Sequence, residues 1–200
     1  WDLRWNELRP IQVDAINALL TTKAQIILAA ATASGKTEAA FLPILSRLAD
    51  SPKPSIQAIY VSPLKALIND QFRRLEELCA RAQIPVHKWH GDVSASKKRR
   101  MRENPRGVLL ITPESLESNF INYGSKLPKI YAHLDFVVID ELHSFLDDVR
   151  GIHLQSLIAR LRAATGRDPR MLGLSATLAD FAPARHYLSP EDPGNVEVIC

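Results

Sequence analysis

The sequence predicts an α/β fold in which a mostly parallel β-sheet is sandwiched between helices. Short, almost continuous runs of Val, Ile and Leu recur along the chain, as is typical of strands that are buried on both faces. Most intervals between these runs carry apolar residues at helical spacing. Alternation of the two patterns indicates a parallel sheet covered by helices on both sides.

Each expected element follows from one of these two patterns. Apolar runs predict strands at 26–31, 57–62, 84–89, 107–112, 135–140 and 170–175. Helical spacing predicts helices at about 10–20, 36–49, 64–82, 94–103, 113–123 and 151–164. Turn-forming residues such as proline, glycine and asparagine interrupt the chain at 51–54, 104–107 and 166–169.

The composition is that of a globular domain. Of the 200 residues, 46% are apolar and 24% are charged, which favours one domain spanning 1–200. A net charge of +3 permits an anionic partner without proving one. Cys79 and Cys200 lack metal-ligand spacing, which favours a reducing cytoplasm over a disulfide scaffold. No apolar run is long enough for a membrane span, and the missing initiator Met predicts a piece of a larger protein.

A phosphate-binding loop is predicted where the first apolar run ends. Residues 30–37 read A-A-T-A-S-G-K-T and lead into a predicted helix. Such a loop aims backbone N–H groups and the Lys36 ammonium at one point, which suits a polyphosphate, and the Thr37 hydroxyl can bind Mg²⁺. Ala30 stands where the strict pattern asks for glycine, so an ordinary strand-to-helix turn with a solvated lysine is the alternative.

A pair of carboxylates makes the phosphate interpretation stronger. The apolar run 137–139 ends in Asp140 and Glu141. Carboxylate oxygens supply what a magnesium ion and an attacking water still need beside a triphosphate. The two motifs together predict an ATPase that uses Mg²⁺.

Five predicted strands end at polar residues that are suited to ligand binding or catalysis. In parallel α/β sheets, ligands gather at the carboxyl ends of the strands. The residues that follow or end these strands are Thr37, Ser62-Pro63, Thr112-Pro113-Glu114, Asp140-Glu141 and Ser175-Ala176-Thr177.

With these strand ends in view, the chain resembles the first RecA-like domain of superfamily 2 helicases, the DEAD/DEAH-like group. Six segments stand in the order of the family's motifs Q, I, Ia, Ib, II and III: residues 9–12, 30–37, 63–67, 112–114, 140–143 and 175–177. The branch that it resembles most is the large helicase-related (Lhr-like) one, through Asp-Glu-Leu-His, His90-Gly91-Asp92, Arg150-Gly151-Ile152-His153-Leu154 and residues 173–178. Ala33-Ser34-Gly35 is also similar to other DNA-directed branches.

The resemblance implies a role for each motif residue. Gln12 would read adenine, because an amide offers a donor and an acceptor in one plane. ATP would be held by Thr32, Ala33, Ser34, Gly35, Lys36 and Thr37. Asp140 would hold Mg²⁺ through water, and Glu141 would orient or deprotonate the attacking water, so Lys36, Asp140 and Glu141 are the expected catalytic residues.

His143 would face Ser175 and Thr177 and couple the nucleotide state to the binding of nucleic acid. The alternatives are a solvated Gln12 and a His143 packed in the core.

Nucleic-acid contacts are expected at the remaining strand ends. Helix N-termini and cations bind backbone phosphates without reading sequence, and the candidates are Ser62, Lys65, His90, Gly91 and Thr112. The basic run Lys97-Lys98-Arg99-Arg100 with Arg102 would extend that surface, but a solvated helix face is the favoured interpretation. Trp5 and Trp89 are expected in the core rather than stacked on bases.

These observations predict the N-terminal motor domain of an ATP-dependent helicase or translocase. Its partners would be single-stranded or partly duplex nucleic acid, with DNA favoured over RNA, and a second RecA-like domain in the same chain. That domain would supply an arginine finger, because Arg150, Arg160 and Arg162 are expected to be solvated or packed through their stems. The alternatives are a DEAD-type RNA helicase and a nucleic-acid or nucleotide-binding module that no longer hydrolyses ATP.

Overall fold

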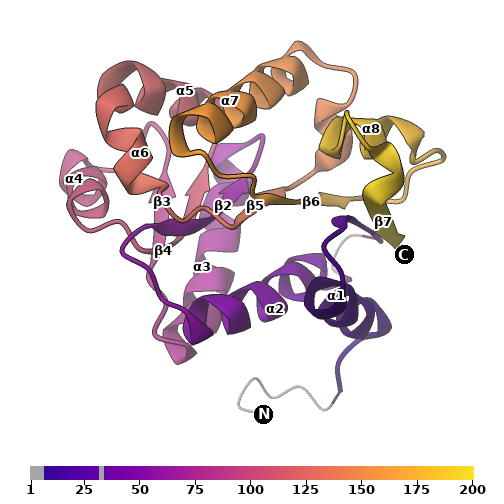
Figure 1. The fold of residues 1–200 in the computed structure, drawn as a ribbon. Coiled ribbons are helices and arrows are strands. Elements are labelled where there is room, and N and C mark those ends of the chain that lie inside the picture. The colour runs from indigo at the N-terminus through magenta and orange to yellow at the C-terminus, as the bar shows by residue number, and fades with distance from the viewer. Residues whose placement is uncertain (1–6, 32–33) are drawn as a thin grey trace.

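The computed structural model describes residues 7–31 and 34–200, and within them it contains one seven-stranded sheet. The strand order is β3-β4-β2-β5-β6-β1-β7, and every neighbouring pair is parallel (Figure 1). The strands are β1 Gln25–Ala29, β2 Ile56–Val61, β3 Val86–Trp89, β4 Gly107–Ile111, β5 Phe136–Ile139, β6 Arg170–Ser175 and β7 Val196–Ile199. The predicted α/β class is therefore confirmed.

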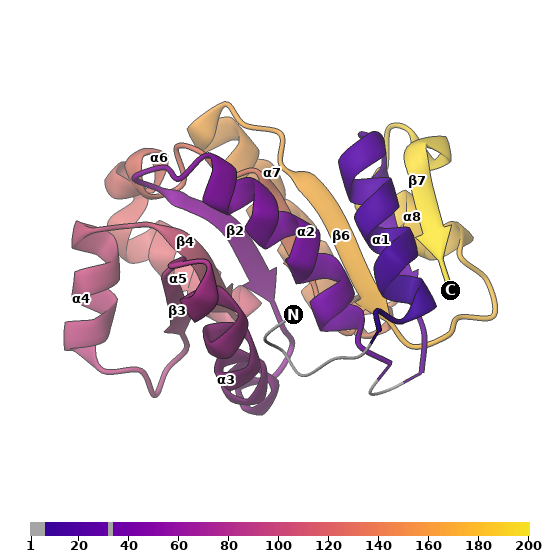
Figure 2. The same ribbon diagram turned by 90° about the horizontal axis from the view of Figure 1, so that it is seen from below.

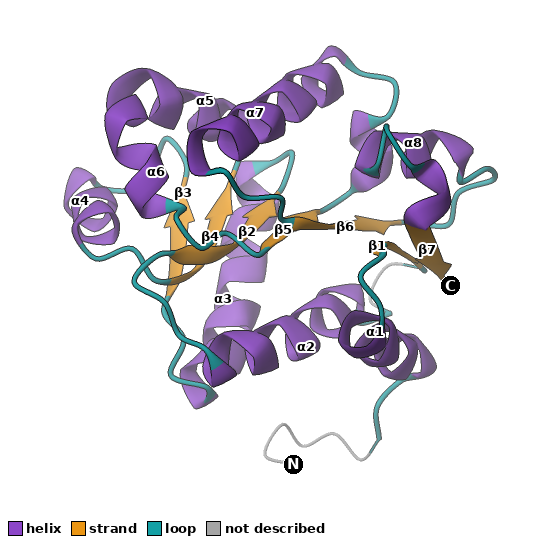
Figure 3. Cartoon of the chain, viewed as in Figure 1, coloured by secondary structure: helices purple, strands orange, loops and turns teal. Residues whose placement is uncertain are grey.

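Helices cover both faces of the sheet. On one face lie α1 Pro10–Thr21, α2 Lys36–Asp50 and α3 Lys65–Arg81, which are nearest to the viewer in Figure 2. The other face carries α5 Pro113–Tyr123, α6 Leu127–Ile130, α7 Val149–Thr165 and α8 Ala182–Leu188, while α4 Ala95–Glu103 lies at the β3 end (Figure 3). Short 3-10 helices are η1 Gly124–Lys126, η2 Leu142–Phe145 and η3 Pro193–Asn195. No helix in the described part of the chain has the length and apolar character needed to cross a membrane.

Two hydrophobic cores, one on each face, explain the almost continuous apolar runs. Successive side chains of a strand point to opposite faces, so both must be apolar when helices cover both sides. On β1, Ile26 and Leu28 pack with α1 and α2, whereas Ile27 packs with α7 and α8 in the opposite core. Trp89 is buried in that second core as predicted, and Trp5 lies outside the described residues.

The structure differs from the sequence prediction at the ends of the sheet. Strand β7 was not predicted, because it is a four-residue edge strand that pairs only with β1. The predicted strand at 84–89 begins at Val86 instead, since Pro85 has no N–H to donate to a ladder. Its carbonyl still accepts a hydrogen bond from the N–H of Val108 at 3.0 Å.

Two arginines fix helix α1 at the amino ends of the strands. Arg170 on β6 donates to the carbonyls of Ala24, Leu19 and Ala18, at 2.7, 2.9 and 3.2 Å, and Arg47 on α2 donates to that of Leu19 at 2.9 Å. The bonds to Leu19 satisfy a carbonyl that the last turn of a helix leaves unpaired. Burial, together with the neighbouring Arg47, lowers the pKa of Arg170 to about 10.

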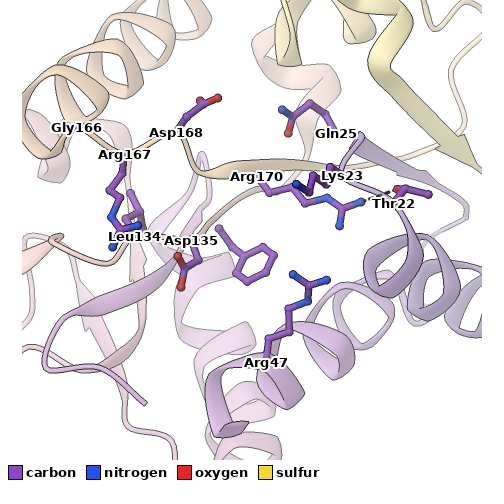
Figure 4. Close-up of a pocket in the computed structure, with 11 residues that line it drawn as sticks. Thr22, Lys23, Gln25, Arg47, Leu134, Asp135, Gly166, Arg167, Asp168 and Arg170 are labelled. Atoms are coloured by element: carbon purple, nitrogen blue, oxygen red, sulfur yellow. Dashed lines mark hydrogen bonds between the residues drawn. The ribbon is translucent and has the colours of Figure 1, made fainter. Parts of the chain in front are cut away.

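Arg47 and Arg170 point into the same cavity of about 660 Å³ (Figure 4). Its lining includes Leu134, Asp135 and Phe136 at the amino edge of the sheet. The cavity thus lies at the opposite edge from the motif residues predicted at the carboxyl ends of the strands. Arg47 and Arg170 serve the fold by holding the carboxyl end of α1.

Helix α7 approaches the segment after β5 so closely that only glycine fits between them. A Cβ added to Gly151 would lie 1.7 Å from the Phe145 carbonyl oxygen. We therefore expect Gly151→Ala to lower the free energy of unfolding by about 3 kcal/mol or more, because backbone must move. Gly124→Ala is the matched control, since no atom lies within 4 Å of its added Cβ. Urea denaturation should show a change below about 1 kcal/mol for this control, and equal losses in both variants would contradict the close approach.

Candidate nucleotide and strand site

Three neighbouring strands bring the nucleotide motifs to one edge of the sheet. Strands β5, β6 and β1 are adjacent, and the pairs Ile139↔Gly173 and Ala29↔Ser175 align their carboxyl ends. The backbone N–H of Ala30 donates to the Ser175 carbonyl at 3.2 Å, which continues the ladder into the loop. Motifs I, II and III are therefore held side by side.

The structure describes the predicted phosphate loop on both sides of residues 32 and 33. Thr32 and Ala33 lie outside the described residues. Beyond them, the Ser34 N–H donates to the Ala31 carbonyl at 3.2 Å, and Gly35 has a φ of +88° that favours glycine. Helix α2 begins directly afterwards at Lys36, as expected for a loop that aims backbone N–H groups at a ligand.

Gln12 is buried against this loop, so the interpretation as a solvated helix residue is wrong. Its side chain is in the first turn of α1, and its Oε1 accepts a hydrogen bond from the Arg9 N–H at 2.9 Å. A Cβ on Gly35 would lie 2.8 Å from Gln12 Nε2. Glycine is therefore favoured at position 35 by its φ, and an added Cβ would also displace the Gln12 amide.

Lys36 lies between the loop and the acidic pair. Its ammonium donates to the Ala30 and Ala31 carbonyls at 2.6 and 2.9 Å. Burial lowers the pKa of Lys36, although the nearby carboxylates of Glu141 and Asp140 oppose that shift. The Lys36 ammonium is thus held by carbonyls of the loop, and its contact with a phosphate stays a prediction.

Asp140 is the buried member of the acidic pair. Its N–H donates to the Val61 carbonyl at 2.8 Å, and its Oδ2 accepts a hydrogen bond from the Tyr60 hydroxyl. Burial raises the pKa of Asp140, and the Tyr60 bond opposes the rise by stabilising the carboxylate. Thr37 is also buried, at the start of α2. A hydroxyl and a carboxylate are hard oxygen donors of the kind that Mg²⁺ takes.

Glu141 has a backbone conformation that is rare for its residue type. Its φ and ψ are +49° and +47°, in the left-handed region, and its side chain is 41% exposed. Strain of this kind costs about 1–3 kcal/mol and is typical of functional sites. It turns the chain sharply after β5, so that Asp140 and Glu141 do not share one environment.

His143 faces motif III, as the sequence predicted. Its Nδ1 lies 3.3 Å from the Ser175 hydroxyl and 3.5 Å from Glu141 Oε2. The side chain of His143 is 41% exposed, so the interpretation as a packed core residue is wrong. Thr177 is exposed, and the structure gives it no hydrogen bond to His143 in the described part of the chain.

The predicted strand contacts gather on the other half of the same edge, but three of the five are buried. Lys65 and Gly91 are exposed and adjacent, because a Cβ on Gly91 would lie 3.2 Å from Lys65 Nζ. Ser62, His90 and Thr112 are buried, so any strand contact there would be made by backbone groups, and it stays a prediction. The Thr112 hydroxyl instead accepts a bond from the Ser115 N–H at 3.3 Å and caps α5.

Comparison with known proteins now decides the family. The model of the DEAD/DEAH box helicases matches residues 9–184. The chain belongs to this family. It is 37% identical to the ATP-dependent helicase Lhr-Core of Methanothermobacter thermautotrophicus over 179 residues, which cover 82% of this chain and 20% of that protein.

Two solved helicase structures resemble this domain closely. The Mycobacterium smegmatis helicase Lhr bound to ssDNA and AMP-PNP has a TM-score of 0.87 and 31% identity, and the match covers 100% of this chain and 26% of that one. The DUF1998 helicase MrfA bound to DNA and AMPPNP has a TM-score of 0.81 and 26% identity, covering 100% and 28%. The predicted RecA-like fold and Lhr-like resemblance are confirmed, and the chain spans roughly a quarter or less of these relatives.

Some members of the helicase site were not recognised in the sequence. Arg150 was expected to be solvated or packed through its stem, yet its guanidinium donates to the Pro63 carbonyl at 2.8 Å and to Glu114 Oε1 at 2.9 Å. It thus joins motif Ia to motif Ib. The other two arginines are also engaged, since Arg160 pairs with Glu117 at 2.8 Å and Arg162 with Asp168 at 2.9 Å.

Two further contacts surround the nucleotide motifs. Glu38 follows Thr37 in α2, is buried, and pairs with Arg74 of α3. Tyr60 reads as one more apolar residue of the buried strand β2. Its hydroxyl was the available signal, because a buried phenol needs a hydrogen-bond partner.

Helix α4 exposes most of its basic residues to solvent, as the sequence predicted. Lys97, Arg99 and Arg100 are exposed. Lys98 and Arg102 lie over the Trp89 ring, with the cations 5.7 and 5.4 Å from its centroid. Part of the helix therefore faces solvent, and part covers an aromatic edge of the core.

Replacing Lys36 tests the phosphate-loop assignment. We expect Lys36→Ala to weaken ATP binding tenfold or more, because a charge-assisted contact is worth roughly 1.5–3 kcal/mol. Titration of a fluorescent ATP analogue measures the effect. Lys129→Ala removes an exposed lysine of α6 and should leave the titration unchanged. An unchanged affinity in Lys36→Ala would contradict the assignment.

Proposed function

We propose that this chain is a motor domain of an ATP-dependent DNA helicase or translocase. One observation carries the proposal: a single sheet edge holds the nucleotide residues on β1, β5 and β6 beside the strand candidates on β2, β4 and β3. Binding of a nucleotide and of a strand would therefore occur on contiguous parts of one rigid surface. The relatives that were solved with DNA support DNA as the partner.

The nucleotide chemistry follows from the positions of four side chains. Lys36 would bind the β- and γ-phosphates, and Gln12 would read the adenine edge. Thr37 and Asp140 would hold Mg²⁺, Asp140 through a water molecule, and the bound ion would neutralise charge on the phosphate oxygens. Glu141, turned away from Asp140 by its left-handed backbone, would orient or deprotonate the attacking water.

Strand binding would use the other half of the edge. Lys65, Gly91 and the amino ends of α3 and α5 are the proposed phosphate contacts, which are blind to base sequence. The contact between His143 and Ser175 is the proposed relay between the two halves, with Thr177 as a further member. Because such contacts do not read bases, an RNA strand is the second candidate, and a binding module without hydrolysis is the third.

A second RecA-like domain would complete the motor. Charge that develops on the γ-phosphoryl group calls for an arginine finger, worth about 10³–10⁵ in rate. Arg150, Arg160 and Arg162 are held by acidic partners, which supports a finger from outside this domain. We place the motor in the cytoplasm, with support from Cys79 and Cys200, which are both free thiols.

Replacing Glu141 separates binding from hydrolysis. In a protein that combines this domain with the proposed second one, we expect Glu141→Gln to retain ATP affinity and to lower turnover by about 10² or more. Phosphate release measures turnover, and the exposed Glu77→Gln is the matched control. Normal turnover in Glu141→Gln would remove it from the mechanism.

The two-domain proposal is tested by comparing ATPase rates. We expect residues 1–200 alone to bind Mg·ATP but to hydrolyse it negligibly, whereas the two-domain protein hydrolyses it and is stimulated by a DNA strand more than by an RNA strand. Comparable stimulated rates in both proteins would refute the need for a second domain. Stronger stimulation by RNA would favour the second candidate, and absent hydrolysis in both would favour the third.

A further inference from the structure

Tyr60 lies where the nucleotide motifs meet the core, although it belongs to none of the motifs. It is the fifth residue of β2 and is fully buried. Its ring lies against Phe41 of the phosphate-loop helix α2, with centroids 6.0 Å apart. Its hydroxyl donates a hydrogen bond to Asp140 Oδ2. The phenol therefore connects the helix after motif I with the carboxylate of motif II.

Backbone pairing between β2 and β5 also fixes the relative position of Tyr60 and Asp140. Tyr60 pairs with Val138 and Val61 with Ile139 in the parallel β2–β5 ladder. The next rung is the bond from the Asp140 N–H to the Val61 carbonyl at 2.8 Å. The phenol and the carboxylate project from neighbouring, hydrogen-bonded strands, so their mutual position follows from the register of the sheet.

The bond restricts one oxygen of Asp140 and leaves acceptor capacity on the carboxylate. An ionised carboxylate has about four lone-pair sites, of which Tyr60 uses one. Asp140 lies in a buried environment where solvent cannot hold its rotamer. A fixed donor is then the means of aiming the remaining lone pairs. Groups that orient a metal-binding residue in this way typically change metal affinity 10–100-fold when removed.

We propose that Tyr60 is a positioning residue for magnesium, which holds the Asp140 carboxylate in the orientation that accepts a metal-bound water. The proposal rests on the proposed function, because it concerns the same nucleotide site. It adds a role for a residue outside the helicase motifs. A hydroxyl that only satisfied the core would affect stability and nothing else.

The test is the magnesium dependence of nucleotide binding in Tyr60→Phe. This change keeps the ring against Phe41 and removes the hydroxyl that donates to Asp140. We expect affinity for a fluorescent ADP in excess chelator to stay within about twofold of the original. The Mg²⁺ concentration that gives half of the magnesium-dependent gain in affinity should rise about tenfold.

Tyr187→Phe is the matched control. Tyr187 on α8 is also buried, and its hydroxyl donates to the Gly151 carbonyl at 2.8 Å. Both variants lose one buried hydrogen bond and should show similar losses of thermal stability. Only Tyr60→Phe should shift the magnesium requirement. Equal magnesium requirements in the two variants would overturn the proposal and leave Tyr60 with a packing role.

A double-mutant comparison tests whether Tyr60 acts through Asp140. In an Asp140→Asn background, Tyr60→Phe should add no further increase in the magnesium requirement, because its partner carboxylate is gone. Additive increases would overturn the proposal, since Tyr60 would then act by another route. If the original chain binds nucleotide but gains no affinity from Mg²⁺, the positioning role fails. If it binds no nucleotide at all, the proposed function fails as well.

Discussion

Parallel pairing of the strands is the constraint on which the rest of the structure depends. All strands end at the same edge, and the ladder continues one residue further at each motif. Ala30 bonds to Ser175, Asp140 to Val61 and Ser62 to Ile111 through backbone groups at 2.8–3.2 Å. Because these bonds involve no side chain, the positions of the motifs are fixed by register before any site chemistry is added. Helices on both faces then make the strands apolar throughout, so that polar residues remain only where the strands end.

The electrostatics of the site depend on keeping opposite charges near but not in contact. Burial lowers the pKa of Lys36, while Asp140 and Glu141 raise it. Burial raises the pKa of Asp140, while the Tyr60 hydroxyl and the Lys36 ammonium lower it. Lys36 and Asp140 thus each favour the charged form of the other, against the effect of burial. Among the described residues, the hydrogen-bond partners of Lys36 are the Ala30 and Ala31 carbonyl oxygens, which are weaker acceptors than a phosphate. A polyanion with a divalent cation is complementary to such an arrangement.

The sequence predicted most of this architecture, and the failures have physical reasons. All six predicted strands exist, because strands buried on both faces are recognisable as apolar runs, and the motifs mark where they end. The edge strand β7 is short and pairs on one side, so its pattern is weak. The burial of Ser62 and Thr112 could not be predicted from the sequence, because a polar residue after a strand gives the same sequence pattern whether it faces solvent or caps a helix. The bond from Arg150 to Pro63 spans 87 positions, and long-range contacts of this kind leave no local pattern.

Two contacts that the sequence did not predict tie the two halves of the edge together, while Arg150 of α7 joins the loop before α3 to the first turn of α5. Tyr60 of β2 donates to Asp140 after β5, and Arg74 of α3 pairs with Glu38 next to Thr37. Helix α3 therefore begins at a proposed strand contact and is anchored beside the proposed metal ligand. Paired charges and packed strands transmit a conformational change from one half of the edge to the other only if some element of the domain has two alternative arrangements. We propose that this domain moves as one body and that the motion of the motor occurs between it and the proposed second domain, so that the nucleotide and the strand are bound where the two domains close.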